Sequence, residues 1–116
     1  MNLFVCNGRL VAPPEGKTLQ SGTILCTFRL AIKARSGKYT YFIDCKSFGQ
    51  TAERMIDQNL PKGQKLYIED GELTEEKWTT KEGANRTKHS ILCNWFYADM
   101  GVNQNTETSD EGVNTF

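Results

Sequence analysis

The sequence predicts an all-β protein, a small five-stranded Greek-key barrel with one short helix between its third and fourth strands. Three observations support this fold class. Five segments carry strand-like patterns, one segment after the third of them has helical periodicity, and all of them fit within about one hundred residues. A closed barrel of the OB type has this order of elements, and such barrels commonly bind oligonucleotides across one face.

The first three strands are expected in the first half of the chain. An apolar run at residues 2–10 is followed by two prolines and a glycine at residues 12–16, which predict an irregular turn. Residues 23–35 alternate between apolar and polar side chains, and a turn at residues 36–38 leads into the aromatic and β-branched segment 39–48, which predicts a hairpin. The expected buried face of the second strand consists of Ile24, Cys26, Phe28, Leu30 and Ile32.

A short amphipathic helix is expected after the third strand. Ala52, Met55 and Ile56 recur at i, i+3 and i+4, which places them on one face of a helix. Asn59 and Pro61 are expected to end it.

The last two strands are expected to form a long hairpin. Strand signals cover residues 64–73 and continue past Trp78, break at residues 81–85, and return over residues 86–99. Trp95, Phe96 and Tyr97 follow one another in the last of these segments. Because this segment lacks basic neighbours, at least two of the three rings are expected to be structural.

The domain organisation follows from the distribution of apolar residues. Residues 1–100 are expected to form one domain. Residues 101–116 contain only Val102, Val113 and Phe116 as apolar side chains, too few to offset the entropy of ordering them, so a disordered tail is predicted.

The charges are divided unevenly between these two parts. The whole chain carries 14 Lys plus Arg and 14 Asp plus Glu, for a formal net charge of zero. Glu107, Asp110 and Glu111 lie in the tail without a basic residue, so residues 1–100 hold 14 basic and 11 acidic groups, a net charge of +3. A mildly basic domain with an acidic tail indicates two separate roles.

Composition disfavours several function classes. There is no run of roughly 18 apolar residues for a membrane span and no secretory signal pattern, so a soluble, cytoplasmic protein is expected. With one histidine, His89, no nucleophile motif and no phosphate-binding glycine loop, an enzyme is not expected. No metal or cofactor is expected either, because the cysteines lack paired spacing and are predicted to be buried free thiols. They are Cys6, Cys26, Cys45 and Cys93.

Aromatic and basic side chains are expected on the solvent-facing side of the barrel. On the third strand, alternation places Phe42, Lys46 and Phe48 opposite the apolar face, and Trp78 lies in the hairpin of the last two strands. Flat rings on which bases stack, with cations beside them, are what binding of single strands without sequence reading requires. The cations expected to contact phosphates on these elements are Arg29, Lys33, Arg35, Lys46 and Lys77.

Taken together, the segments resemble the bacterial and phage single-stranded DNA-binding protein family. The resemblance covers residues 2–100 in order, and the combination is specific although no single piece is. The stretches that carry it are NLFVCNGRL, PEGKTLQSGTILCTFRLAI, YFIDCKSFGQTAERM, KGQKLYIEDGEL, KWTTKEGANR and SILCN.

The resemblance implies binding and protection of single-stranded DNA during replication, recombination or repair. It implies stacking roles for Phe42, Phe48 and Trp78, and nucleic-acid-facing roles for the basic residues Arg9, Lys17, Lys33 and Arg35. It also implies a homotetramer whose barrels associate partly through the first strand.

The chain departs from the family pattern at several places. The loop at residues 36–38 is short and lacks a stacking tryptophan, for which Tyr39 or Tyr41 is expected to substitute. Glu75 and Glu76 are expected to lower phosphate affinity, and an extra residue in IEDGEL predicts a bulge at residues 70–71. In the tail, an atypical tip keeps three residues with which it is expected to recruit replication or repair proteins: Asp110, Glu111 and Phe116.

Two other functions stay open from the residues alone. The near-zero net charge and the Glu75–Glu76 pair are compatible with a protein-interaction OB module of the primosome accessory type. Base stacking ignores the sugar unless something reads the 2′-hydroxyl, so the stacking residues are also compatible with an RNA chaperone.

Overall fold

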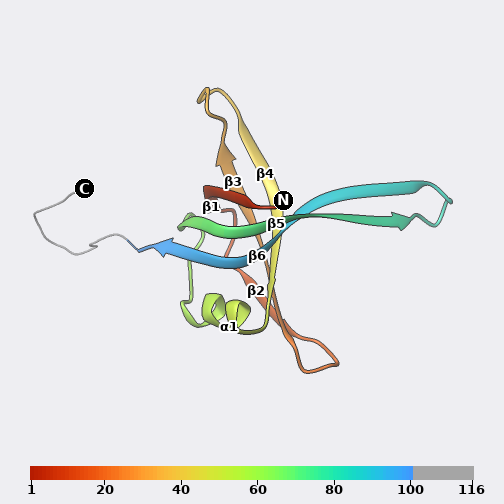
Figure 1. Ribbon diagram of the computed structural model, residues 1–116, viewed down its shortest axis with the longest axis horizontal. Helices are drawn as coiled ribbons and strands as arrows, with labels where there is room; N and C mark the ends of the chain where they lie inside the picture. Colours follow the sequence, from red (N-terminus) through yellow and green to blue (C-terminus); the bar gives the residue numbers. More distant parts are fainter. Residues whose placement is uncertain (101–116) are drawn as a thin grey trace, which may run out of the picture.

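The computed structural model describes residues 1–100; the predicted tail and its docking residues Asp110, Glu111 and Phe116 lie outside the described residues. Figure 1 shows the strands with one short helix below them and a long hairpin projecting to one side. The elements are β1 (Phe4–Leu10), β2 (Glu15–Thr18), β3 (Ile24–Lys33), β4 (Thr40–Phe48), α1 (Gly49–Asp57), β5 (Lys65–Thr79) and β6 (Asn85–Asp99).

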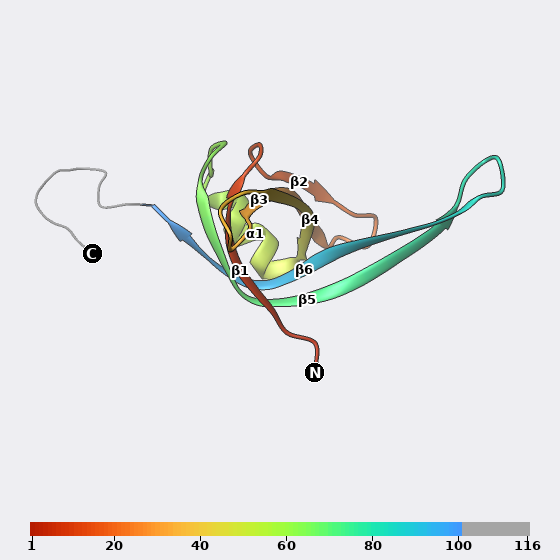
Figure 2. The ribbon, with the colours of Figure 1, turned by 90° about the horizontal axis from the view of Figure 1, so that it is seen from above.

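Five strands close into a barrel. The sheet order is β1-β5-β6-β4-β3-β2, and an additional pairing of β1 with β3 closes the ring. All of these pairs are antiparallel except β4 with β6. In Figure 2 the closed strands surround the core, and α1 is seen inside their outline. The predicted five-stranded OB-type barrel with a helix between its third and fourth long strands is confirmed.

The short strand β2 is a correction to the sequence analysis, which expected only an irregular turn over residues 12–16. β1 pairs with β3 only at Leu30 and Ala31, so the preceding edge of β3 would be left without partners. β2 pairs with residues 24–27 of that edge and extends the sheet past the barrel. An unpaired strand edge carries exposed backbone donors and acceptors, which explains why the chain forms this pairing locally.

The core lies where strand alternation placed it. Cys26, Phe28 and Leu30 of β3 are buried, while Ile24 and Ile32 at the strand ends are partly buried and pack against the core. The other large buried side chains come from β1, α1, β5 and β6, and they are Leu10, Met55, Leu66, Ile68, Ile91 and Phe96.

The helix α1 packs against the barrel through the predicted face, with Ala52 and Met55 fully buried. Ile56 is 38% exposed. Arg54 holds the helix to β6, because its Nη2 donates to the carbonyl of Phe96 and its guanidinium lies 4.1 Å from the ring centre of Trp95. In residues 1–100 no helix is long and apolar enough to cross a membrane.

The bulge expected at residues 70–71 is present in the β5–β6 hairpin. Ile68 is opposite Phe96 and Gly71 is opposite Cys93, a register that would place Asp70 opposite Asn94. Asp70 is instead opposite Trp95, so the register shifts on both sides of Asp70. A Cβ at Gly71 would lie 2.9 Å from the carbonyl oxygen of Phe4 on β1, so β1 passes too close for a side chain at this position. The irregularity therefore lies where β5 curves against β1.

The three aromatic residues near the end of β6 alternate about the sheet. Phe96 is 1% exposed, whereas Trp95 and Tyr97 are 50% and 55% exposed. Phe96 lies in the core and the Trp95 ring packs against Arg54 of α1, so two of the three rings contact other parts of the fold, although only Phe96 is buried. Period-two alternation sends neighbouring side chains to opposite faces.

We expect Gly8→Ala to destabilise the protein by about 1–3 kcal/mol, because the added methyl group overpacks the closure of the barrel. A Cβ at Gly8 would lie 2.7 Å from the backbone carbonyl oxygen of Ala31, which cannot move without disturbing β3. Gly16→Ala is the control, because its Cβ would meet only the end of the flexible Ile56 side chain, at 2.5 Å. Urea unfolding of both variants tests this, and an equal or larger loss in Gly16→Ala would contradict it.

The four thiols should react slowly in the folded protein. Cys26, Cys45 and Cys93 are buried, as predicted, while Cys6 is half-buried. Burial raises the pKa of Cys6 and Cys26 from 9.0 to about 11, that of Cys93 to about 12, and that of Cys45 further still. Since the thiolate is the reactive form, alkylation at pH 8 should be much slower than in guanidinium.

The raised thiol pKa values also make the stability of the folded protein depend on pH. A raised folded-state pKa means that folding disfavours the thiolate, so this contribution to stability is complete below about pH 9 and declines as pH rises toward the folded values near 11 and 12. Alkylation rates that match the denatured protein at pH 8 would show that the thiols are accessible and would contradict the buried arrangement.

Candidate nucleic-acid interface

The outward faces of β3 and β4 carry five of the predicted binding residues, which are Arg29, Lys33, Phe42, Lys46 and Phe48. The register places Arg29 beside Asp44, Ala31 beside Phe42, and Leu25 beside Phe48. Because these pairs alternate with the core pairs, their side chains share the outer face of the barrel.

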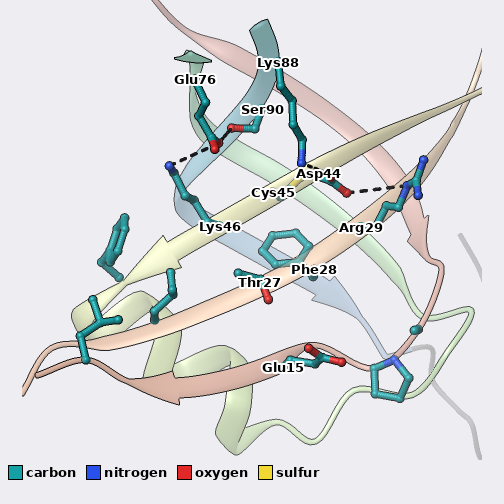
Figure 3. A pocket seen from close by; sticks show the side chains of 15 residues that line it. Glu15, Thr27, Phe28, Arg29, Asp44, Cys45, Lys46, Glu76, Lys88 and Ser90 are labelled. Carbon is teal, nitrogen blue, oxygen red and sulfur yellow. Dashed lines mark hydrogen bonds and ion pairs between the residues drawn. The ribbon is translucent and has the colours of Figure 1, made fainter. Parts of the chain in front are cut away.

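A groove of about 730 Å³ runs over this outer face. It is lined by the segment around β2, by β3 and β4, and by the base of the β5–β6 hairpin. Figure 3 shows Glu15 on one side of the groove and Glu76, Lys88 and Ser90 on the other, with Arg29, Asp44 and Lys46 between them.

The predicted stacking residues are all solvent-accessible. Phe42, Phe48 and Trp78 are 54%, 40% and 47% exposed, and Tyr39 is 64% exposed. Phe48 lines the groove itself. Phe42 lies farther along the same face of β4, with the guanidinium of Arg29 5.3 Å from its ring centre. Half-exposed rings on an outer sheet face leave room for a base to stack.

The two faces of the β5–β6 hairpin carry different residues. Glu76 is opposite Lys88 and Trp78 is opposite Arg86, so these four side chains share the face of the buried Ser90. Figures 1 and 2 show the far end of this hairpin projecting well beyond the barrel. The hairpin therefore extends the groove face outward, with Trp78 toward its tip.

Lys77 lies on the other face of the hairpin from Trp78. Its Nζ is 3.3 Å from Glu75 Oε1, and His89 Nε2 is 3.2 Å from the other oxygen of the same carboxylate. The structure therefore does not bring Lys77 together with the groove residues, because adjacent residues of a strand point to opposite faces.

The remaining predicted cations are distributed around the barrel. Lys17, Lys33 and Arg35 are exposed, and within residues 1–100 none of them has an ion-pair partner. Arg9 Nη1 donates to the carbonyl of Gly63 at 3.0 Å and lines a second hollow of about 370 Å³ that shares no lining residue with the groove.

Reasoning from sequence missed several groove residues, including Lys88 and Ser90. Lys88 lines the groove, and Ser90 Oγ donates to Glu76 Oε2 at 2.8 Å. The alternation of β6 places Lys88 on the outer face, but it does not show which strand lies beside β6. The sequence therefore could not predict that Lys88 lines the groove next to β4. The parallel pairing of Cys45 with Ile91 supplies that neighbour relation.

Hydrogen bonds and ion pairs between neighbouring side chains determine the charge states of the groove residues. Hydrogen bonding from Ser90, followed by the charge of Lys46, lowers the pKa of Glu76. Hydrogen bonding to Asp44 raises the pKa of Lys88. Both shifts favour the charged forms, so Glu76 is a carboxylate and Lys88 is an ammonium at neutral pH.

Comparison with known proteins agrees with this geometry. The family model described as the single-strand binding protein family matches residues 1–99. The chain is 38% identical to the single-stranded DNA-binding protein of Helicobacter hepaticus over 97 residues, covering 78% of this chain and 56% of that protein. It is 32% identical to the single-stranded DNA-binding protein of Fusobacterium nucleatum, covering 97% of this chain and 77% of that protein.

A solved structure shows the same fold at lower identity. A deletion mutant of the single-stranded DNA binding protein from Thermus aquaticus superposes with a TM-score of 0.70 at 20% identity, covering 87% of this chain and 51% of that chain. The chain spans between 53% and 59% of the length of the Helicobacter and Wolinella succinogenes relatives that it matches. The match of the family model over residues 1–99 shows that the chain belongs to the single-strand binding protein family.

Proposed function

We propose that the protein binds single-stranded DNA without reading its sequence. The observation that carries this proposal is the placement of Phe42, Phe48 and Trp78, half-exposed rings on the outer face of β4 and on the groove face of the β5–β6 hairpin. Bases of a single strand stack on such rings, and each stacked base contributes about 1–3 kcal/mol. The relatives named as single-stranded DNA-binding proteins support the same substrate.

Phosphates of the strand would be held by cations along the same surface. Lys17, Lys33 and Arg35 are exposed at the edges of β2 and β3, where a strand stacked on β4 would pass. Nothing in this arrangement distinguishes one base from another, because every base has a flat face. The protein would therefore protect single strands during replication, recombination or repair, with no catalytic step of its own.

The outer face of β1, β5 and β6 is the proposed self-association surface. The register puts Asn7, Tyr67 and Tyr97 in one row across the three strands. The two tyrosine ring centres are 6.0 Å apart, Tyr97 is 55% exposed, and Val5 on the same face of β1 is 61% exposed. Aromatic residues are enriched at protein interfaces, so this face would join copies of the chain, as a homotetramer requires.

Recruitment of replication or repair proteins by Asp110, Glu111 and Phe116 stays a prediction, since these residues lie outside the described part of the chain. Light scattering and partner capture with and without residues 101–116 would address it independently of DNA binding.

Trp78→Ala should weaken binding to oligo(dT) by about 1–3 kcal/mol without creating a preference for any base, because one stacking surface is lost. Phe42→Ala and Phe48→Ala should behave in the same way. Fluorescence anisotropy with labelled oligonucleotides of different sequence measures this, with circular dichroism to confirm folding. Trp95→Ala is the control: Trp95 is 50% exposed, much as Trp78 is at 47%, but it lies near the other end of β6, where its ring packs against Arg54 of α1. Equal losses in Trp78→Ala and Trp95→Ala would remove Trp78 from the site.

Tyr97→Asp should reduce the size of the assembly, because a charge in an apolar interface leaves a desolvated carboxylate without a partner. Multi-angle light scattering at micromolar concentration should show a tetramer for the original protein and a smaller species for the variant. Tyr41→Asp is the matched control, because Tyr41 is 59% exposed but lies in β4, away from β1, β5 and β6. A monomeric original protein would exclude the proposed assembly.

A further inference from the structure

Two carboxylates lie among the cations of the groove. The Oδ atoms of Asp44 lie 3.7 Å from Arg29 Nε and 2.5 Å from Lys88 Nζ. Glu76 Oε2 lies 3.6 Å from Lys46 Nζ. Figure 3 shows these side chains meeting across the strands. Within residues 1–100, every cation that lines the groove therefore has a carboxylate partner.

Glu76 is held in this position by more than its ion pair. Ser90 Oγ donates to Glu76 Oε2 at 2.8 Å, and Thr74 Oγ1 lies 2.9 Å from the same Ser90 oxygen. Ser90 is only 3% exposed, and its hydroxyl is held between Thr74 and Glu76, so its position is fixed by neighbouring groups of the hairpin. An anchored partner loses less side-chain entropy on pairing than two free surface side chains do.

Asp44 is placed by the sheet itself. It lies directly opposite Arg29 in the β3–β4 register, and Lys88 reaches it from β6, on the other side of β4. Asp44 thus bridges cations from two different strands. Its position follows from the strand pairing, so the carboxylate is present in the groove before any ligand arrives.

Phosphate groups of a bound strand would need the same three cations. We propose that Asp44 and Glu76 act as built-in competitors that occupy Arg29, Lys46 and Lys88 and thereby lower the ionic part of DNA binding. This inference rests on the proposed function. Its consequence is that binding depends mainly on stacking, so polyanions that offer no bases are held poorly by the groove.

Glu76→Gln tests the inference against a closely matched control. The variant frees Lys46, so oligo(dT) should bind about two- to fivefold more tightly near 0.15 M salt. The slope of log K against log salt should steepen by about 0.7, the value for one more phosphate neutralised on a single strand. Glu75→Gln changes the net charge equally at the adjacent residue, and the Glu75 side chain is 44% exposed against 45% for Glu76. Because Glu75 faces away from the groove, its variant should leave the slope unchanged.

Asp44→Asn provides a second and independent measurement. It frees both Arg29 and Lys88, so the salt slope should steepen by about twice as much as in Glu76→Gln. Asp57→Asn on the exposed side of α1 is its control, with the same change of charge away from the groove. Asparagine and glutamine keep the side-chain size, and circular dichroism verifies that each variant folds.

The outcomes separate the inference from the function on which it rests. Failure of the original protein to bind oligo(dT) would overturn both. Binding by the original protein, with equal salt slopes in Glu76→Gln and Glu75→Gln, would overturn this inference alone, because net charge would then explain any gain in affinity. Steeper slopes confined to Glu76→Gln and Asp44→Asn would support it.

Discussion

The arrangement of this protein depends on the close approach of β1 to β3, where Gly8 passes the backbone of Ala31 without room for a side chain. This contact converts an open sheet into a closed barrel, because β1 then pairs with both β3 and β5. A small barrel buries one face of every strand in a single core. Closure therefore leaves the other face of β3 and β4 available as an uninterrupted outer surface, on which the groove lies.

The two faces of β4 have different roles, one in the core and one on the outer surface. On β4, Cys45 and Ser47 are buried in the barrel, whereas Phe42 and Phe48 on the opposite face are half-exposed. Rings that contribute little to the core are free to serve a ligand. The β5–β6 hairpin extends this division beyond the barrel, with Trp78 on the groove face and Lys77 on the other. The proposed binding surface thus results from the alternation of side chains along β4 and along the part of the hairpin that extends beyond the core.

The electrostatic character of the groove is not that of the domain as a whole. Residues 1–100 carry a net charge of +3, yet the groove cations are matched by Asp44 and Glu76. Net charge describes long-range attraction, whereas affinity in a groove depends on which groups are adjacent. Within residues 1–100, the exposed Lys17 and Lys33 have no ion-pair partner and retain the long-range attraction.

Much of the fold and part of the candidate site could be predicted from the sequence. Alternation in residues 23–35 and 39–48 determined which side chains of β3 and β4 face the core, because a period of two is a local property of an extended chain. The same reasoning placed Phe42 and Phe48 on the opposite face, whereas the bulge near Gly71 was expected from an extra residue relative to the family spacing. These features depend on neighbours within a few residues, and local patterns report such neighbours.

The pairings between strands that do not form a hairpin follow from long-range contacts and could not be predicted from the sequence. The parallel contact of β4 with β6 and the resulting meeting of Lys88 with Asp44 join segments whose patterns do not refer to one another. Exposure of Trp95 and Tyr97 likewise depends on which element covers the outer face of β6. Local patterns in the sequence are thus enough to predict the strands and their inner faces, whereas the groove and its ion pairs arise from long-range pairing, which no local periodicity encodes.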